Sequence, residues 1–150
     1  MSGSEKLSAS LEDYIEAIYN LSKEAAVVRS KDMAKLLNVS KASVTGALRA
    51  LKDKKMINYQ PYDFITLTDS GKTAAAEVAQ KHSVLKSFFT DVLQISPEMA
   101  QQAACKAEHT LGPKVVYKLL CFTEFVSSEN ENGLDIVTKF AQFNRKHNSD

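Results

Sequence analysis

The chain has 150 residues, of which 44% are hydrophobic and 25% are charged, the composition of an ordinary globular protein. Its apolar runs are too short to cross a bilayer, and its first residues lack the apolar core of a secretion signal, so we expect no membrane partner. Cys105 and Cys121 lack the spacing of a disulfide framework. These features exclude membrane and disulfide-rich secreted classes, and we expect a cytoplasmic protein.

The net charge of +1 conceals a local excess of positive charge. Residues 29–55 contain eight lysines and arginines but only two aspartates, a net charge of +6 over 27 residues. A basic block in a near-neutral chain is typical of a surface that binds phosphates. On charge alone, a solvated helix face explains the block equally well.

Hydrophobic periodicity predicts three helices in the first part of the chain. The first follows a cap at Ser10, the second runs from Ser30 to about Asn38, and the third is capped by Ser40. After Lys55 the period shortens, which predicts two short strands around a turn at residues 60–63.

The second part of the chain is predicted to be entirely helical. A long helix runs from Ser70 to about Leu93, and Ser96 caps another with proline in its first turn, ending near Gly112. A further helix runs from Pro113 to Phe125, followed by a polar linker at residues 127–133 and an amphipathic terminal helix. The fold class is therefore mainly α with a small β-hairpin.

A helix, a short turn, a second helix and a β-hairpin follow one another in the order of a winged helix-turn-helix. In such a pair the second helix enters the major groove of DNA with its N-terminal residues near the base edges. The alternative is a helical hairpin with a coincidental strand pair. The residues expected to contact double-stranded DNA are Arg29, Lys31, Ser40, Lys41, Ala42, Ser43, Thr45, Gly46, Arg49 and Lys52.

Three potential metal ligands share one side of a predicted helix. At about 100° per residue, Cys105, Glu108 and His109 fall on one narrow face. A thiolate, a carboxylate and an imidazole together suit a divalent transition metal. A polar, solvent-facing stripe that happens to include a cysteine is an equally good interpretation of the spacing.

Two other segments carry groups of the same chemistry. Asp13 and Glu16 are three residues apart in the first helix, opposite its apolar stripe, where acidic residues are usually just solvated. His82 lies on an apolar helix face, which is more typical of a core histidine than of a ligand. Nothing in the spacing brings these segments together.

Several motifs occur in the order found in one known family: Leu11 to Tyr19, the helix-turn-helix with Ser43-Val44-Thr45, Leu67 to Gly71, Lys81-His82 and Ala104 to His109. Over roughly residues 8–147 the chain resembles the diphtheria-toxin-repressor family of metal-dependent regulators, in particular its short manganese-transport-regulator branch. The resemblance implies a winged-helix DNA-binding domain at residues 1–72, a helical metal-binding and dimerisation domain at 73–150, and no SH3-like third domain.

By position, the resemblance assigns six metal ligands: Asp13, Glu16, His82, Cys105, Glu108 and His109. By analogy with a binuclear site, Asp13, Cys105, Glu108 and His109 would surround one ion. Glu16 and His82 would hold a second, and Glu108 would be shared between the two.

Some positions depart from the family pattern. Cys105 stands where the manganese branch carries glutamate and the iron-responsive branch carries cysteine, whereas Asp13 matches the manganese branch. Lys86 and Gln101 replace the ligands of the ancillary iron-type site, and Gly46 replaces a longer polar residue of the recognition helix.

The resemblance implies a homodimeric transcriptional regulator, expected to act as a repressor of metal-uptake genes at palindromic operators. Mn(II) or Fe(II) is the expected activator, and Co(II) or Zn(II) would bind in vitro. The alternatives are a winged-helix regulator that senses oxidation of Cys105 or a small organic ligand, and a metalloenzyme built on the cysteine-bearing helix face. We find no glycine-rich phosphate loop and no Ser/His/Asp set, so we expect no enzymatic activity.

Overall fold

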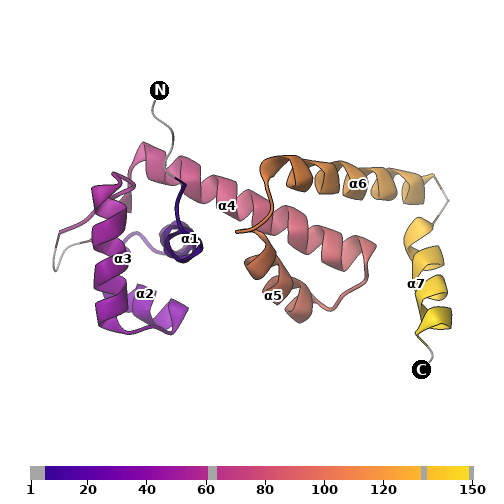
Figure 1. Cartoon of the computed structure of the whole chain (residues 1–150), viewed down its shortest axis with the longest axis horizontal. Helices are drawn as coiled ribbons and strands as arrows, with labels where there is room; N and C mark the ends of the chain where they lie inside the picture. The colour runs from indigo at the N-terminus through magenta and orange to yellow at the C-terminus, as the bar shows by residue number, and fades with distance from the viewer. Residues whose placement is uncertain (1–5, 61–63, 133–134, 149–150) are drawn as a thin grey trace. The chain divides into compact units, whose positions relative to one another are not determined.

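A computed structural model describes residues 6–60, 64–132 and 135–148 (Figure 1). The chain forms two compact units, Met1–Ala79 and Gln80–Asp150. The first contains the helix-turn-helix and its two-stranded sheet, and the second is helical. The mainly α fold with a small β-hairpin is therefore confirmed.

Three helices build the first unit, and their starts follow from local capping. They are α1 (Ala9–Glu24), α2 (Ser30–Leu37) and α3 (Lys41–Asp53). The hydroxyl of Ser8, not that of Ser10, caps α1 by accepting a hydrogen bond from the amide of Leu11 at 3.2 Å. The predicted cap is wrong by two residues because Leu7 is buried in the core, which lets the helix begin directly after Ser8.

The turn between α2 and α3 is set by two polar residues. Asn38 ends α2 in the left-handed conformation, with φ 52° and ψ 50°, which asparagine tolerates better than most residues. Ser40 then caps α3, since its hydroxyl accepts a hydrogen bond from the amide of Ser43 at 3.1 Å. The predicted cap at Ser40 is confirmed.

The predicted hairpin is present as β1 (Ile57–Asn58) and β2 (Thr66–Leu67), which pair antiparallel with Ile57 opposite Leu67. Val28, between α1 and α2, forms a further bridge to Ile65. The turn predicted at residues 60–63 falls largely on residues 61–63, which lie outside the described part of the chain.

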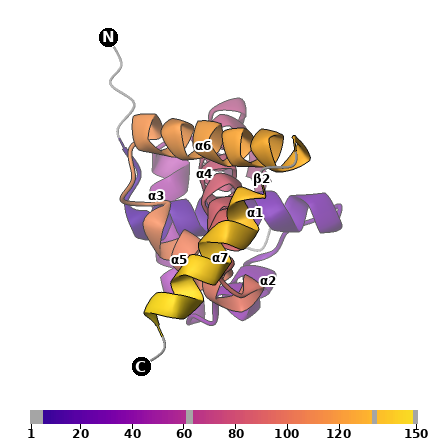
Figure 2. The same cartoon turned by 90° about the vertical axis from the view of Figure 1, so that its right-hand side faces the viewer.

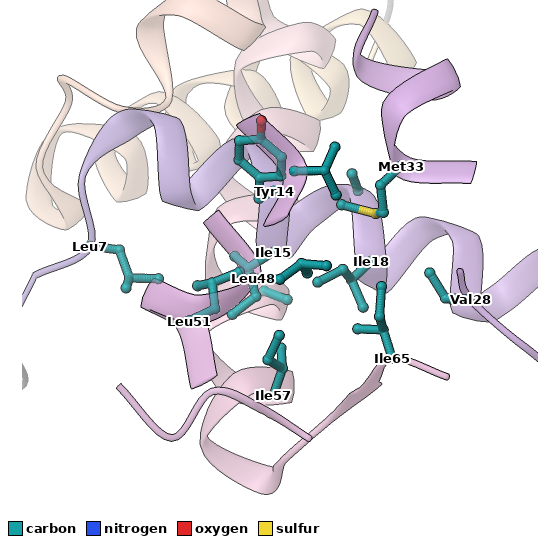
Figure 3. Packing of buried hydrophobic residues seen from close by; sticks show 13 residues of the cluster. Leu7, Tyr14, Ile15, Ile18, Val28, Met33, Leu48, Leu51, Ile57 and Ile65 are labelled. Carbon is teal, nitrogen blue, oxygen red and sulfur yellow. The ribbon is translucent and has the colours of Figure 1, made fainter. Parts of the chain in front are cut away.

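Buried side chains from all these elements meet in one core (Figure 3). Ile15 and Ile18 of α1 are completely buried, as are Leu48 and Leu51 of α3. Ile57 and Ile65 close the core from the sheet side (Figure 3). Burying side chains of this size contributes about 1.5–3 kcal/mol each, so this core holds α1 against the helix-turn-helix and the sheet.

Helix α4 (Asp69–Ser87) begins in the first unit and ends in the second. It continues into a π-helical turn, η1 (Phe88–Val92), and Gln94 then reverses the chain at a positive φ of 59°. The second unit is completed by α5 (Pro97–Ala107), α6 (Pro113–Glu131) and α7 (Ile136–His147), labelled in Figure 2.

Two sequence-based boundaries in this unit are wrong. α5 ends at Ala107 and is followed by turns, rather than continuing towards Gly112. α6 extends through most of the predicted linker at 127–133, because Val126 is buried and keeps the helix packed beyond Phe125. The Asn130 side chain also accepts a hydrogen bond from the amide of Ile136 at 2.7 Å, which joins the end of α6 to the start of α7.

Apolar contacts inside the second unit bring η1 against both α5 and α6. Phe88 of η1 contacts Phe122 of α6, with ring centroids 6.3 Å apart. The alanines Ala100 and Ala104 are completely buried on α5, where small side chains allow close helix packing. Among the described residues, no helix is long and apolar enough to span a membrane.

A glycine joins the sheet to the first turn of α4. The amide of Thr68 donates to the carbonyl of Met56 at 3.0 Å, and its hydroxyl accepts from the amide of Gly71 at 3.1 Å. These bonds press Gly71 so closely against Met56 that a Cβ atom would overlap the Met56 carbonyl oxygen. Only glycine fits this contact, which explains the glycine of the Leu67-to-Gly71 motif.

We expect Gly71→Ala to lower the free energy of unfolding by about 1–3 kcal/mol, because overpacking against backbone cannot be relieved by a rotamer change. Gly46→Ala is the matched control, since a Cβ at Gly46 meets nothing within 4 Å and alanine favours the helix by about 1 kcal/mol. Urea unfolding followed by circular dichroism measures both changes. Equal effects of the two substitutions would contradict the steric explanation.

Candidate functional site

The N-terminal half of α3 presents small and basic residues to solvent. Val44, Leu48 and Leu51 are completely buried, which turns the opposite side of the helix outward. Of the residues expected to contact DNA, Arg29, Lys31, Ser40, Lys41, Ala42, Ser43, Gly46, Arg49 and Lys52 are exposed and Thr45 is half-buried. This surface has the size, charge and accessibility that DNA binding requires.

The hydroxyl groups at this end of α3 are engaged within the helix. The Ser43 hydroxyl lies 2.9 Å from the Ser40 hydroxyl, which also caps the helix. The Thr45 hydroxyl donates to the carbonyl of Lys41 at 3.0 Å. These side chains therefore stabilise the start of the recognition helix.

Arg29 links the start of α2 to the β1–β2 hairpin, which forms the wing of the winged helix-turn-helix. Its guanidinium lies over the ring of Phe64, 5.3 Å from the ring centroid, and its amide donates to the Asp32 carboxylate at 3.2 Å. A cation–π contact of this kind stabilises an exposed pair by about 0.5–1 kcal/mol. Arg29 thus holds a positive charge beside the sheet.

The two predicted acidic ligands of the first unit lie on α1. Asp13 is exposed and Glu16 is half-buried, while Tyr14 and Ile15 between them point into the core. Three residues apart on a helix, the two carboxylates lie on neighbouring positions of the same face.

In the second unit, four of the predicted ligands come together around Glu108. Its side chain is only 1% exposed, and its Oε2 atom lies 2.7 Å from Nδ1 of His82. Its other oxygen, Oε1, lies 3.5 Å from Nε2 of His109. A buried carboxylate is costly unless charged or hydrogen-bonding groups surround it; His82 hydrogen-bonds one oxygen, whereas the buried Oε1 atom makes no hydrogen bond to the nearby His109.

A glutamine and a cysteine extend this cluster. Nε2 of His82 lies 3.0 Å from Oε1 of Gln101, and Nδ1 of His82 lies 3.8 Å from Sγ of Cys105. The amide nitrogen of Gln101 donates to Cys105 Sγ at 3.7 Å, one helical turn along α5. Both nitrogens of the His82 ring therefore have polar partners within the same unit.

The cluster bears on two interpretations that the sequence left open. His82 has polar partners at both ring nitrogens, which fits a satisfied histidine as well as a metal ligand. The interpretation as a solvent-facing stripe is wrong for Glu108, which is buried. Sequence reasoning missed Gln101 as a member of the cluster; its position one turn before Cys105 is the signal that could have found it.

The second cysteine has a different environment. Cys121 lies one turn from Tyr117 on α6, and its hydrogen bond to the phenol is the main cause that raises the pKa of Tyr117 above its ordinary value. Cys121 therefore interacts with a tyrosine of its own helix.

The donor atoms of the cluster fit a divalent transition metal. Imidazole nitrogens, carboxylate oxygens and a thiol sulfur are the ligands that Mn, Fe, Co and Zn ions share in differing proportions. The Glu108 carboxylate, with one oxygen near each histidine, is placed to contribute both of its oxygens. Within the second unit, His82, Cys105, Glu108 and His109 could hold such an ion.

Two family models match the chain in order. The model of the iron-dependent repressor N-terminal DNA-binding domain matches residues 6–64. The model of the iron-dependent repressor metal-binding and dimerisation domain matches residues 68–137. Together they cover the helix-turn-helix, β1, α4 and the cluster around Glu108, and β2 lies in the short gap between the two matches.

Curated relatives agree with this match. An HTH-type transcriptional regulator of Methanocaldococcus jannaschii, MJ0568, is 36% identical over 119 residues, covering 79% of this chain and 95% of the relative. The transcriptional regulator MntR of Salmonella typhimurium is 32% identical over 114 residues, covering 76% of this chain and 72% of MntR.

Solved structures share the fold. The manganese regulator SloR superimposes with a TM-score of 0.69 at 24% identity, and a manganese-dependent transcriptional repressor in complex with manganese with a TM-score of 0.71 at 22% identity. Each match covers 77% of this chain, which spans only about half of the solved chains, 54% and 53%. The chain belongs to the iron-dependent repressor family, also called the diphtheria-toxin-repressor family, and to its MntR-like branch: it is a metal-dependent, DNA-binding transcriptional regulator and not an enzyme.

Proposed function

We propose that this regulator is a repressor of metal-uptake genes that binds palindromic operators as a homodimer when Mn(II) or Fe(II) is present. The observation that carries the proposal is the buried Glu108 carboxylate with a histidine on each oxygen, in the domain that matches the family's metal-binding model. The similarity to MntR regulators and to a manganese-dependent repressor supports manganese or a chemically similar ion.

We propose six metal ligands: Asp13, Glu16, His82, Cys105, Glu108 and His109. Asp13, Cys105, Glu108 and His109 would hold one ion, Glu16 and His82 a second, and Glu108 would be shared. The support is the donor chemistry, the clustering of the last four inside the second unit, and the family resemblance of the α1 motif.

The division of these ligands between the two units suggests how the switch works. Asp13 and Glu16 belong to the unit that carries α3, and the other four belong to the unit that matches the dimerisation model. A bound divalent ion would supply the positive charge that these carboxylates need in order to share a site. A preference of about 1–3 kcal/mol for the DNA-binding arrangement is enough for a switch.

Palindromic recognition follows from the dimer. Two identical recognition helices related by a two-fold axis read two half-sites about one DNA turn apart. The ligands from α1 would restrict how far each helix-turn-helix departs from that spacing. DNA binding and a thiol ligand that must stay reduced both support a cytoplasmic location for this function.

Cys105 bears on the choice of metal. A thiolate favours softer ions such as Fe(II), Co(II) or Zn(II), whereas the carboxylates of Asp13, Glu16 and Glu108 favour Mn(II). Zinc and cobalt therefore bind in vitro whatever the activating ion is in the cell. Regulation by thiol oxidation is the second candidate for Cys105, and the match to a metal-binding domain favours the metal.

We expect Glu108→Gln to weaken Mn(II) binding at least about tenfold, because the amide keeps the shape of the side chain but loses a charged ligand. The variant should also lose Mn(II)-stimulated binding to a DNA duplex selected from a random library. Glu98→Gln is the matched control, since Glu98 is an exposed residue of the first turn of α5. Metal binding is measured by calorimetry and DNA binding by fluorescence anisotropy.

Two results would contradict this assignment. If the unmodified protein binds DNA equally well with Mn(II) and with a chelator, the metal does not act as a switch. If the Glu108→Gln and Asp13→Asn variants both keep the wild-type affinity for metal, these two carboxylates are not ligands.

We expect Cys105→Glu to shift activation of DNA binding towards Mn(II) and away from Co(II) and Zn(II), because an oxygen ligand replaces a sulfur ligand. Cys121→Ser is the control for loss of a thiol elsewhere in the unit. Anisotropy titrations with each metal give the order of activation. An unchanged order in Cys105→Glu would show that Cys105 is not a ligand.

We expect Lys52→Ala to weaken binding to all duplexes about equally and to reduce the slope of log K against log salt by about 0.9 per subunit, since one phosphate contact is lost. Lys139→Ala, an exposed residue of α7, removes the same charge from the other unit and should leave the slope unchanged. Equal slopes for the two variants would remove Lys52 from the DNA-binding face.

A further inference from the structure

Gln101 of α5 contacts two of the proposed ligands with one side chain. Its Oε1 atom lies 3.0 Å from Nε2 of His82, and its amide nitrogen donates to Sγ of Cys105 at 3.7 Å. With about 100° per residue, Gln101, Cys105 and Glu108 fall within about 60° of one another around the helix. Gln101 therefore belongs to the face of α5 that carries the cluster, although it is not one of the six proposed ligands.

The contact with Gln101 determines which nitrogen of the His82 ring carries a hydrogen. An amide oxygen only accepts hydrogen bonds, so Nε2 of His82 must donate in this pair. The other ring nitrogen, Nδ1, lies 2.7 Å from Oε2 of Glu108 and 3.8 Å from Sγ of Cys105. Since an imidazole binds a metal through a nitrogen without a hydrogen, Nδ1 is the atom of His82 that would serve as the ligand.

The other end of the same amide restricts the thiol. Gln101 lies four residues before Cys105, so the two side chains are neighbours on the helix surface, and the N–H group holds Sγ on the side of His82. The oxygen of Gln101 already faces His82, so its role differs from that of a ligand. In the proposed arrangement Cys105 holds one ion and His82 a second, and Gln101 contacts a ligand of each.

We propose that Gln101 is a positioning residue of the metal site, which orients His82 so that Nδ1 faces the ion and fixes the direction of the Cys105 thiol. In the iron-type pattern this position carries a ligand of the ancillary site, so here a glutamine that bonds to two ligands replaces a group that binds an ion. Partners of this kind typically raise metal affinity about 10–100-fold. This inference rests on the proposed function, because it assigns a role within the proposed metal site.

The first test uses Zn(II), which is diamagnetic, and protein labelled with nitrogen-15 in its histidines. The chain has three histidines, so the ring signals of His82 are identified by their absence from His82→Gln. In the unmodified protein we expect a coordinated Nδ1 and a protonated Nε2 whose hydrogen is protected from exchange with solvent. Gln101→Ala should remove this protection and weaken Zn(II) binding about tenfold.

Gln102→Ala is the matched control for this substitution. Gln102 is the neighbouring exposed glutamine of α5, and its side chain makes no hydrogen bond to any described residue. Both substitutions replace the same residue type in the same helix, so they change helix propensity equally. We expect Gln102→Ala to keep the His82 signals and the Zn(II) affinity of the unmodified protein, and circular dichroism checks that both variants are folded.

Gln101→Glu separates the two contacts of Gln101. A carboxylate still accepts the hydrogen of His82 Nε2 but has no hydrogen to donate to Cys105 Sγ. We therefore expect this variant to retain the protected Nε2 hydrogen. In the Co(II)-loaded protein, the sulfur-to-cobalt charge-transfer band should change in Gln101→Glu as it does in Gln101→Ala. A purely structural role for Gln101 would not separate these two signals.

Coordination of Zn(II) through Nε2 of His82 would overturn the inference. The same His82 signals and Zn(II) affinity in Gln101→Ala as in Gln102→Ala would also overturn it, and so would a Co(II) band that neither Gln101 variant changes. All three results leave the proposed metal site intact. Failure of the unmodified protein to bind either Zn(II) or Co(II) would instead contradict the proposed function.

Discussion

A buried carboxylate between two imidazoles constrains the second unit of this regulator. Glu108 is almost completely buried, with one oxygen 2.7 Å from His82 and the other 3.5 Å from His109. The carboxylate cannot occupy this position without groups that stabilise its charge. The ending of α5 at Ala107, the completely buried Ala104 and the course of α4 through His82 together place those groups. The same arrangement surrounds the carboxylate with the nitrogen, oxygen and sulfur donors that we propose as metal ligands.

Helix α4 is the structural element that DNA binding and metal binding have in common. It begins at a contact that only glycine permits, where Gly71 meets the carbonyl of Met56 and Thr68 bonds to both sides of the joint. Three turns later the same helix carries His82 into the metal-binding domain. The close contact between Gly71 and Met56 therefore fixes the start of α4, and the later part of the same helix contributes the proposed ligand His82.

The DNA-binding unit divides affinity and specificity between different residues. Exposed lysines and arginines on and around α3 carry the positive charge that we propose attracts any duplex, an attraction that would weaken with salt. The first turns of α3 instead present Ala42 and Gly46, flanked by hydroxyls that bond within the helix. These are the residues that would set sequence selection, because the N-terminal residues of a recognition helix lie near the base edges.

Most of the helices and the order of the winged helix-turn-helix were predictable from the sequence, because hydrophobic periodicity and caps such as Ser40 and Ser96 act over a few residues. The Cys105, Glu108 and His109 set was recognisable for the same reason: its members are close in the chain. Local patterns misplaced the start of α1 and the end of α6, where the burial of Leu7 and Val126 decides the boundary. The family resemblance grouped His82 with Glu108, but only the tertiary structure shows their direct contact and places Gln101 beside His82. Contacts between residues 19 and 26 positions apart depend on how helices pack and not on any local pattern.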